Sequence, residues 1–258
     1  MFGGRVHNPA MTHDLSRRSA LAFGMGAFAL PLIAPRPASA GLSPILVELF
    51  TSQGCSSCPP ADKVLGQLKK RGDLIAVSLN VDYWDYLGWR DTLARPEYSQ
   101  RQFDYAKSRG DGQAYTPQVV VNGRYHAVGS RLSDVERAIE IARPQPANVP
   151  IMIKANQSEF TVEIPESGFK GNATLWLMAI APEKRQVIER GENAGTTVTY
   201  HNVVRNMVPA AMWDGSAFSQ KWTKDAVLGE DCKSCIAVLQ QDKTGPVLGL
   251  AQWNRTIS

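Results

Sequence analysis

The sequence GCSSCPP, at residues 54–60, separates a strand-like run from a helix-like run, and this order decides the fold. Residues 45–50 before it form a short apolar run with one acid, which is typical of a buried strand. Apolar residues recur at helical spacing over residues 61–68 after it. The sequence therefore predicts a strand, a turn that contains two cysteines, and a helix.

Cys55 and Cys58 in this turn can close a small disulfide and reopen it. At the start of a helix, the sulfur of Cys55 meets backbone N–H groups without a partner and the positive end of the helix dipole. Both favour the thiolate, so we expect a lowered pKa for Cys55 and a nucleophilic sulfur. A structural disulfide and a metal-binding half-site are the alternative interpretations.

Residues 1–40 have the pattern of an export signal peptide. Arg17 and Arg18 precede an apolar run over residues 21–33, and the small residues ASA end the pattern at residues 38–40. We expect cleavage after this pattern. The apolar run is too short for a membrane span, so no stable membrane span is expected after cleavage.

The sequence SRRSAL, at residues 16–21, resembles the twin-arginine export signal. Ala20 stands where that motif usually has Phe, so export through the general secretory route stays open as an alternative. In either case we expect a periplasmic or secreted protein.

The formal charge of +4 reflects the first 40 residues, which hold four of the 28 basic residues and one of the 24 acidic residues. The remainder of the chain is nearly neutral. A nucleic-acid partner would need a clustered basic surface, so we expect none. All four cysteines lie after residue 40, and an oxidising compartment would keep them as disulfides or redox pairs.

Further strands and helices are predicted between the cysteine motif and residue 143. A second apolar strand after the first helix favours parallel pairing of the two strands. The aromatic-rich residues 82–95 are interpreted as a loop whose rings either shield the cysteines or pack on the sheet edge. The predicted strands are 74–81, 117–121 and 125–128, and the predicted helices are 96–108 and 133–142.

The pattern of apolar and polar residues changes after a Pro-rich linker at residues 144–150. Beyond it, short runs alternate between apolar and polar residues, which indicates strands of an antiparallel sheet. We therefore predict a second, β-rich domain over residues 151–258.

Three motifs carry a resemblance to a known family: VELFTSQGCSSCPPAD at residues 47–62, NVDYWD at 80–85 and YTPQ at 115–118. Together they resemble the secreted thioredoxin-like family called domain of unknown function 1223, over nearly all of residues 41–253. The resemblance implies an α/β fold in which a thioredoxin-like domain at residues 41–143 precedes the smaller antiparallel β domain.

The resemblance also implies a role for the residues of the third motif. In the broader thioredoxin class, the proline that faces the disulfide is cis, and this position falls on Pro117. The cis form of an X–Pro bond costs only about 0.5–1 kcal/mol. A proline there leaves the backbone of Thr116 to pair with an incoming substrate strand. An ordinary trans proline at the start of a strand is the alternative.

Glu48 lies in the strand before the cysteines, where the thioredoxin class commonly has a buried acid. Burial would raise the pKa of this carboxyl group, which would then suit it to accept the proton of Cys58. A structural glutamate in a salt bridge is the alternative interpretation.

The function predicted from these residues is that of an exported thiol-disulfide oxidoreductase without a cofactor. Cys55 would attack a protein or small-molecule disulfide, and Cys58 would resolve the mixed disulfide. Ser56 and Ser57 would tune the potential. The rival predictions are a soft-metal (copper) carrier that uses the same two thiolates, and a thioredoxin-like binding scaffold whose disulfide is inert.

Cys232 and Cys235 form a second Cys-x-x-Cys pair. We expect a local disulfide that pins a loop of the β domain, and a relay that exchanges with Cys55 and Cys58 is the alternative. A joint four-cysteine zinc site is disfavoured, because zinc ribbons separate their pairs by about 15–20 residues. Haem attachment is excluded because no His follows either pair.

Overall fold

The computed structural model describes residues 43–145 and 147–255, and the predicted export signal lies outside the described residues. In the first half of the chain, the strands and helices follow one another in the predicted order. Its elements are β1 (Ile45–Thr51), α1 (Pro59–Leu68), β2 (Leu74–Asn80), the 3-10 helix η1 (Asp85–Leu87), α2 (Pro96–Arg109), β3 (Gln118–Val121), β4 (Tyr125–Val128) and α3 (Leu132–Ala142).

The second half is mainly β structure. Its elements are β5 (Met152–Ala155), β6 (Glu159–Ile164), β7 (Ala173–Val187), β8 (Thr197–Trp213), β9 (Phe218–Thr223), α4 (Lys224–Val227), β10 (Ser234–Gln241) and β11 (Val247–Asn254). β7 continues beyond its apolar run at residues 173–180 into a hairpin arm with exposed side chains, and β8 continues beyond residue 204 along the first half of β7. Pairing between the two strands satisfies the backbone there without an apolar pattern.

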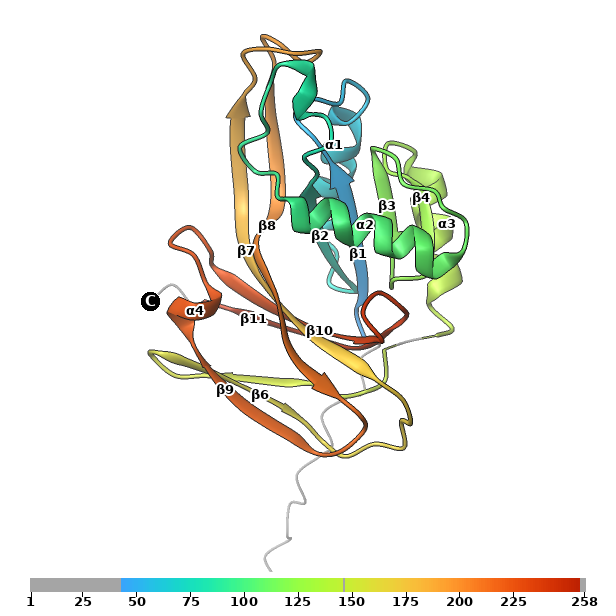
Figure 1. The fold of residues 1–258 in the computed structure, drawn as a ribbon, viewed down its shortest axis with the longest axis vertical. Helices are drawn as coiled ribbons and strands as arrows, with labels where there is room; N and C mark the ends of the chain where they lie inside the picture. The colour runs from blue at the N-terminus through green and yellow to red at the C-terminus, as the bar shows by residue number, and fades with distance from the viewer. Residues whose placement is uncertain (1–42, 146, 256–258) are drawn as a thin grey trace, which may run out of the picture. The chain divides into compact units, whose positions relative to one another are not determined.

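One eight-stranded sheet joins the two halves of the chain, in the order β11-β10-β7-β8-β2-β1-β3-β4 (Figure 1). β1 pairs in parallel with β2 and antiparallel with β3, and β3 pairs antiparallel with β4. Strands β5, β6 and β9 form a separate antiparallel sheet. The chain therefore has a mixed α/β fold, with a large mixed sheet and a smaller antiparallel sheet.

The two predicted domains, residues 41–143 and 151–258, share the large sheet at the β2–β8 boundary. Ser78 of β2 pairs with Val203 of β8, and Asn202 Nδ2 donates a hydrogen bond of 2.9 Å to the carbonyl of Ala76. An uncovered β2 would present a row of unpaired backbone groups, which β8 covers in part. The linker at residues 144–150 therefore joins two parts of the chain that share one sheet, and does not separate two independent sheets.

Alternation along β1 sends its side chains to opposite faces of the sheet. Phe50 packs with Tyr105 of α2 on one face, whereas Leu49 packs with Leu65 of α1 and Ile139 of α3 on the other. The helix that follows the cysteines and the helix α2 therefore lie on opposite sides of β1, which decides which acids can reach the sulfurs.

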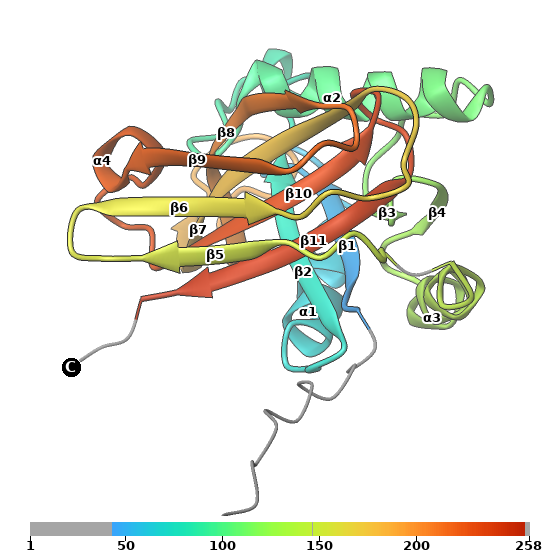
Figure 2. The same ribbon diagram turned by 90° about the horizontal axis from the view of Figure 1, so that it is seen from below.

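The small sheet of β5, β6 and β9 packs over the part of the large sheet that holds β7, β10 and β11 (Figure 2). Phe160 and Val162 of β6 share a buried cluster with Leu175 of β7 and Ala237 of β10. This core lies between two sheets, and both face it with alternate residues, as the predicted alternation requires.

Candidate redox site

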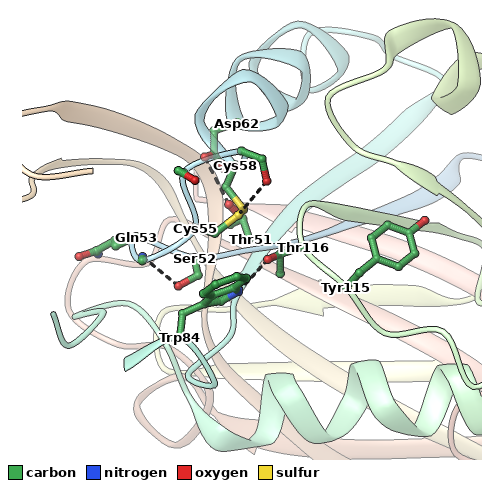
Figure 3. The surroundings of a disulfide bond; sticks show 12 residues. Thr51, Ser52, Gln53, Cys55, Cys58, Asp62, Trp84, Tyr115 and Thr116 are labelled. Carbon is green, nitrogen blue, oxygen red and sulfur yellow. Dashed lines mark hydrogen bonds between the residues drawn. A yellow bond between two sulfur atoms is a disulfide. The ribbon is translucent and has the colours of Figure 1, made fainter. Parts of the chain in front are cut away.

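A disulfide joins Cys55 and Cys58 in the turn between β1 and α1 (Figure 3). Backbone hydrogen bonds from Cys55 N to Ser52 O and from Cys58 N to Cys55 O, of 3.2 and 3.1 Å, shape this turn. Cys55 is 1% exposed and Cys58 is completely buried. The motif that sequence analysis singled out is therefore a closed, buried disulfide at a helix start.

The start of α1 offers fewer amide donors to the sulfur than the sequence predicted. Pro59 and Pro60 occupy the first two helical positions, and proline has no N–H. The amides of Ala61 and Asp62 both donate to the carbonyl of Cys58. The helix dipole still favours a thiolate here. The expected unpartnered amides are missing, because two of the positions are prolines and the next two amides already donate to a carbonyl.

The hydroxyl group of Ser57 contacts the sulfur of Cys55. The Oγ–Sγ distance is 3.4 Å, and because a disulfide sulfur carries no hydrogen, the hydroxyl group is the donor in this state. The same donor would stabilise a thiolate at Cys55 after reduction. The Ser57 hydroxyl group therefore supplies one hydrogen-bond donor in place of the backbone N–H groups that the prolines lack.

We predict that Ser57→Ala slows alkylation of reduced Cys55 at neutral pH by about fivefold, because a typical intramolecular hydrogen bond contributes about 0.5–1.5 kcal/mol. The measurement is the rate of modification by a small alkylating reagent. Ser56→Ala is the matched control, since its side chain is exposed and makes no hydrogen bond to the sulfur among the described residues. Equal rates for the two variants would contradict this role.

Trp84, in the loop between β2 and α2, lies beside the disulfide and reaches the third motif (Figure 3). Its Nε1 donates to Thr116 Oγ1 at 2.8 Å, and the Thr116–Pro117 peptide bond is cis, the isomer that the resemblance implied. A Cβ atom added at Gly54 would approach Trp84 Cβ to 2.9 Å. Glycine before Cys55 thus leaves room for an aromatic ring that comes from another loop.

Gln53 links the cysteine turn to the loop at residues 82–95. Its backbone amide donates to Asp91 Oδ2 at 2.8 Å, and its Oε1 accepts from Trp89 Nε1 at 2.7 Å. Asp91 Oδ2 also accepts from Asn80 Nδ2 at 2.9 Å. Of the two interpretations for the aromatic loop, the contacts of Trp84 and Trp89 favour the one in which rings surround the turn.

Sequence reasoning missed the contribution of the β7–β8 hairpin. Asn193 Nδ2 donates to the carbonyls of Gln53 and Cys55, both at 2.9 Å, and the Ser56 amide donates to Glu192 Oε2 at 3.4 Å. These residues lie more than 130 positions from the turn in the sequence, within a polar stretch that reads as an ordinary loop. No local pattern could have found them.

The acid next to the disulfide is Asp62, in the first turn of α1 (Figure 3). Thr51 Oγ1 donates to Asp62 Oδ2 at 3.3 Å, and Asp62 Oδ1 has no partner among the described residues. Burial raises the pKa of Asp62 well above its ordinary value, and the nearby Asp91 adds to this effect. Its spacing of four residues from Cys58, one helical turn, was the signal available in the sequence.

Glu48 does not lie on the side of β1 that carries α1. It forms a buried ion pair with Arg101 of α2, with 2.7 Å between Oε1 and Nε, and it accepts a hydrogen bond of 2.5 Å from Tyr105. The proton relay expected at Glu48 is therefore wrong, and the structural salt bridge is the correct alternative. The reason is strand alternation, which turns Glu48 toward α2 and Thr51 toward α1.

Cys232 and Cys235 are unpaired thiols, so the local disulfide expected there is not formed. Both are buried in the core between the two sheets, with 0% and 1% exposure. Burial raises the pKa of both thiols, that of Cys235 to about 12. Buried neutral thiols are poor nucleophiles, and this also disfavours the relay with the first pair.

The described residues contain no group of three or more His, Cys, Asp or Glu side chains placed to hold a metal ion. None of the described helices is long and apolar enough to cross a membrane.

These features define a class: a mixed α/β protein with a buried Cys-x-x-Cys disulfide at a helix start. The chain belongs to the family described as "Protein of unknown function (DUF1223)", whose model matches residues 46–240. That match includes residues of both predicted domains. A search of curated proteins gave no match.

Two solved structures are similar to this one. A protein from Agrobacterium tumefaciens, solved by a structural genomics consortium, is 30% identical, with a TM-score of 0.73 and coverage of 84% of this chain and 97% of that chain. HBP35 of Porphyromonas gingivalis is 11% identical, with a TM-score of 0.60 and coverage of 83% and 76%. The second likeness concerns the fold alone.

Proposed function

We propose that this protein is an exported thiol-disulfide oxidoreductase with a thioredoxin-like arrangement of its first half. The observation that carries the proposal is the closed Cys55–Cys58 disulfide at the start of α1, with the Ser57 hydroxyl on the sulfur of Cys55. A donor on that sulfur favours the anion that thiol-disulfide exchange requires.

Support for the thioredoxin-like arrangement comes from the strand order β2-β1-β3-β4, with α1 and α3 on one face and α2 on the other. The position of Pro117 directly before β3, with Trp84 on the neighbouring Thr116, adds to it. Export is supported by the pattern of residues 1–40, and the periplasm or the cell exterior is the proposed location.

The proposed reaction transfers two electrons between thiol pairs. In the reduced protein, the Cys55 thiolate attacks one sulfur of a substrate disulfide, a mixed disulfide forms and one substrate thiolate leaves. The Cys58 thiolate then attacks the sulfur of Cys55, which releases the second substrate thiolate. The protein dithiol becomes the disulfide and the substrate disulfide becomes a dithiol, and the same steps in reverse oxidise a substrate.

Cys58 must lose its proton before the second step. We assign Asp62, in place of Glu48, as the group that accepts this proton. A carboxyl group whose pKa is raised by burial is a stronger proton acceptor than an ordinary aspartate, so it can take the proton of Cys58 and return it when the disulfide re-forms. Asp62 lies one helical turn after Cys58, and its Oδ1 has no hydrogen-bond partner among the described residues.

The test of the proposed function uses single cysteine variants of the mature chain. We expect Cys55→Ser to abolish reduction of a protein disulfide, whereas Cys58→Ser should accumulate mixed disulfides, because the resolving thiol is absent. Adducts are detected as thiol-sensitive bands after trapping in a cell extract, and Cys232→Ser is the control that should leave both results unchanged. Absence of adducts with Cys58→Ser would overturn the proposal.

One observation favours a second candidate, the binding scaffold with an inert disulfide. Cys55 and Cys58 are almost completely buried in the oxidised state, and buried cysteines are generally unreactive. Equilibration with glutathione separates the two functions. A redox-active pair interconverts near the potential of the buffer, whereas an inert disulfide stays closed at potentials where structural disulfides resist glutathione.

A further inference from the structure

The tip of the β7–β8 hairpin is fixed against the cysteine turn. Asn193 is 6% exposed, and its side-chain amide donates to two carbonyls of the turn, those of Gln53 and Cys55. The tip is also braced internally, since Thr196 Oγ1 donates to the carbonyl of Asn193 at 2.7 Å. This part of the chain was predicted to belong to a separate domain, yet it is anchored to the backbone of the cysteine turn.

The anchored tip places a carboxylate on the backbone amide that follows Cys55. Glu192 Oε2 accepts from the amide of Ser56, the residue that follows Cys55, at 3.4 Å. An anion at a helix start draws on the same dipole and the same amides that would stabilise a thiolate. Those amides are scarce here, because Pro59 and Pro60 supply none.

We propose that Glu192 makes the Cys55 thiolate less stable and so lowers the reduction potential of the Cys55–Cys58 pair, with Asn193 as the positioning residue that holds Glu192 in place. This inference rests on the proposed function and adds to it a device that tunes the redox pair from the second half of the chain. A less stable thiolate shifts the exchange with oxidised glutathione toward the protein disulfide and two reduced glutathione molecules.

The first experiment compares the wild-type protein with Glu192→Gln in glutathione buffers. We expect the equilibrium constant for disulfide formation to fall about two- to fivefold, the effect of one charge at a helix terminus. The thiolate fraction at neutral pH, followed by ultraviolet absorbance, should rise. High salt should reduce both differences, because Glu192 is exposed and its charge is screened.

Glu189→Gln is the matched control, since this exposed carboxylate of the same hairpin has no hydrogen bond or ion pair to the turn among the described residues. Asn193→Ala should shift the equilibrium in the same direction as Glu192→Gln, because the tip is released. The double variant should then shift it no further than the larger single effect, which marks the two residues as coupled.

Equal equilibrium constants for wild type, Glu192→Gln and Glu189→Gln would overturn the inference, even if Asn193→Ala fails to fold. These measurements use the protein's own cysteines and need no substrate. A shift with Glu192→Gln in a protein that never turns over a disulfide substrate would therefore uphold the tuning and overturn the proposed function alone.

Discussion

Replacing Arg101 by methionine is expected to destabilise the protein by about 3–5 kcal/mol, the cost of leaving a buried charge without its partner. Arg101 and Glu48 have 2% and 0% exposed side chains and meet at 2.7 Å. Arg101 Nη2 also donates to Gln240 Oε1 at 3.0 Å. The variant leaves the Glu48 carboxylate in a dry interior, at the point where β1, α2 and β10 are tied together.

This effect is measured by urea denaturation of the oxidised protein. The double variant Glu48→Leu/Arg101→Met should recover most of the loss, because two apolar side chains often replace a buried ion pair at little cost. Lys154→Met is the surface control, since the Lys154–Glu163 pair has a 63% exposed lysine side chain, and we expect a change below about 1 kcal/mol. A loss no larger than this control in Arg101→Met would contradict the argument.

Replacing Asp62 by asparagine is expected to slow resolution of the mixed disulfide by about a hundredfold, the lower range for loss of a general acid-base group. Asparagine keeps the shape of the side chain and can still accept from Thr51 Oγ1, but it cannot take a proton from Cys58. The measurement is single-turnover release of substrate from a preformed mixed disulfide at Cys55. Glu189→Gln, at an exposed carboxylate with no hydrogen bond to the turn among the described residues, is the control that should leave this rate unchanged. A similar rate in Asp62→Asn would exclude the assigned role.

The same variant is expected to change how stability depends on pH. Burial raises the pKa of Asp62 above its ordinary value of 3.8, so the folded state binds this proton more tightly than the unfolded state. Stability from this group is therefore complete below pH 3.8 and is lost as the pH rises through the folded pKa. Asp62→Asn should be more stable than wild type at neutral pH and should flatten this decline.

Some pH dependence of stability should remain in Asp62→Asn, because burial also raises the pKa of Asp91. The pH dependence left in Asp62→Asn should be reduced further by Asp91→Asn, which also weakens the support of Gln53. Denaturation series at several pH values give both slopes. Identical slopes in wild type and Asp62→Asn would show that Asp62 is ionised equally in both states.

The order of elements around the cysteine motif could be predicted because each signal is local. Hydrophobic periodicity over residues 45–68 defined β1 and α1, and the cysteine spacing defined the turn. The acid was placed at Glu48 because the resemblance pointed to an acid in the strand before the cysteines. Only the alternation of β1, seen against the packed helices, separates Glu48 from the face that carries Asp62.

The far half of the site could not be predicted, because its residues have no sequence relation to the turn. Asn193 and Glu192 reach the cysteines only through the length and register of the β7–β8 hairpin. Likewise Cys232 and Cys235 read as a candidate disulfide until their burial between two sheets is known.

The sequence by itself determined the cysteine pair and the strand and helix that flank it. The tertiary structure decided which carboxylate lies beside the sulfurs, that both halves of the chain share one sheet, and that a distant hairpin closes the site. The physical reason is the range of the forces involved. Periodicity and capping act within a few residues, whereas burial and electrostatics depend on which surfaces meet in space.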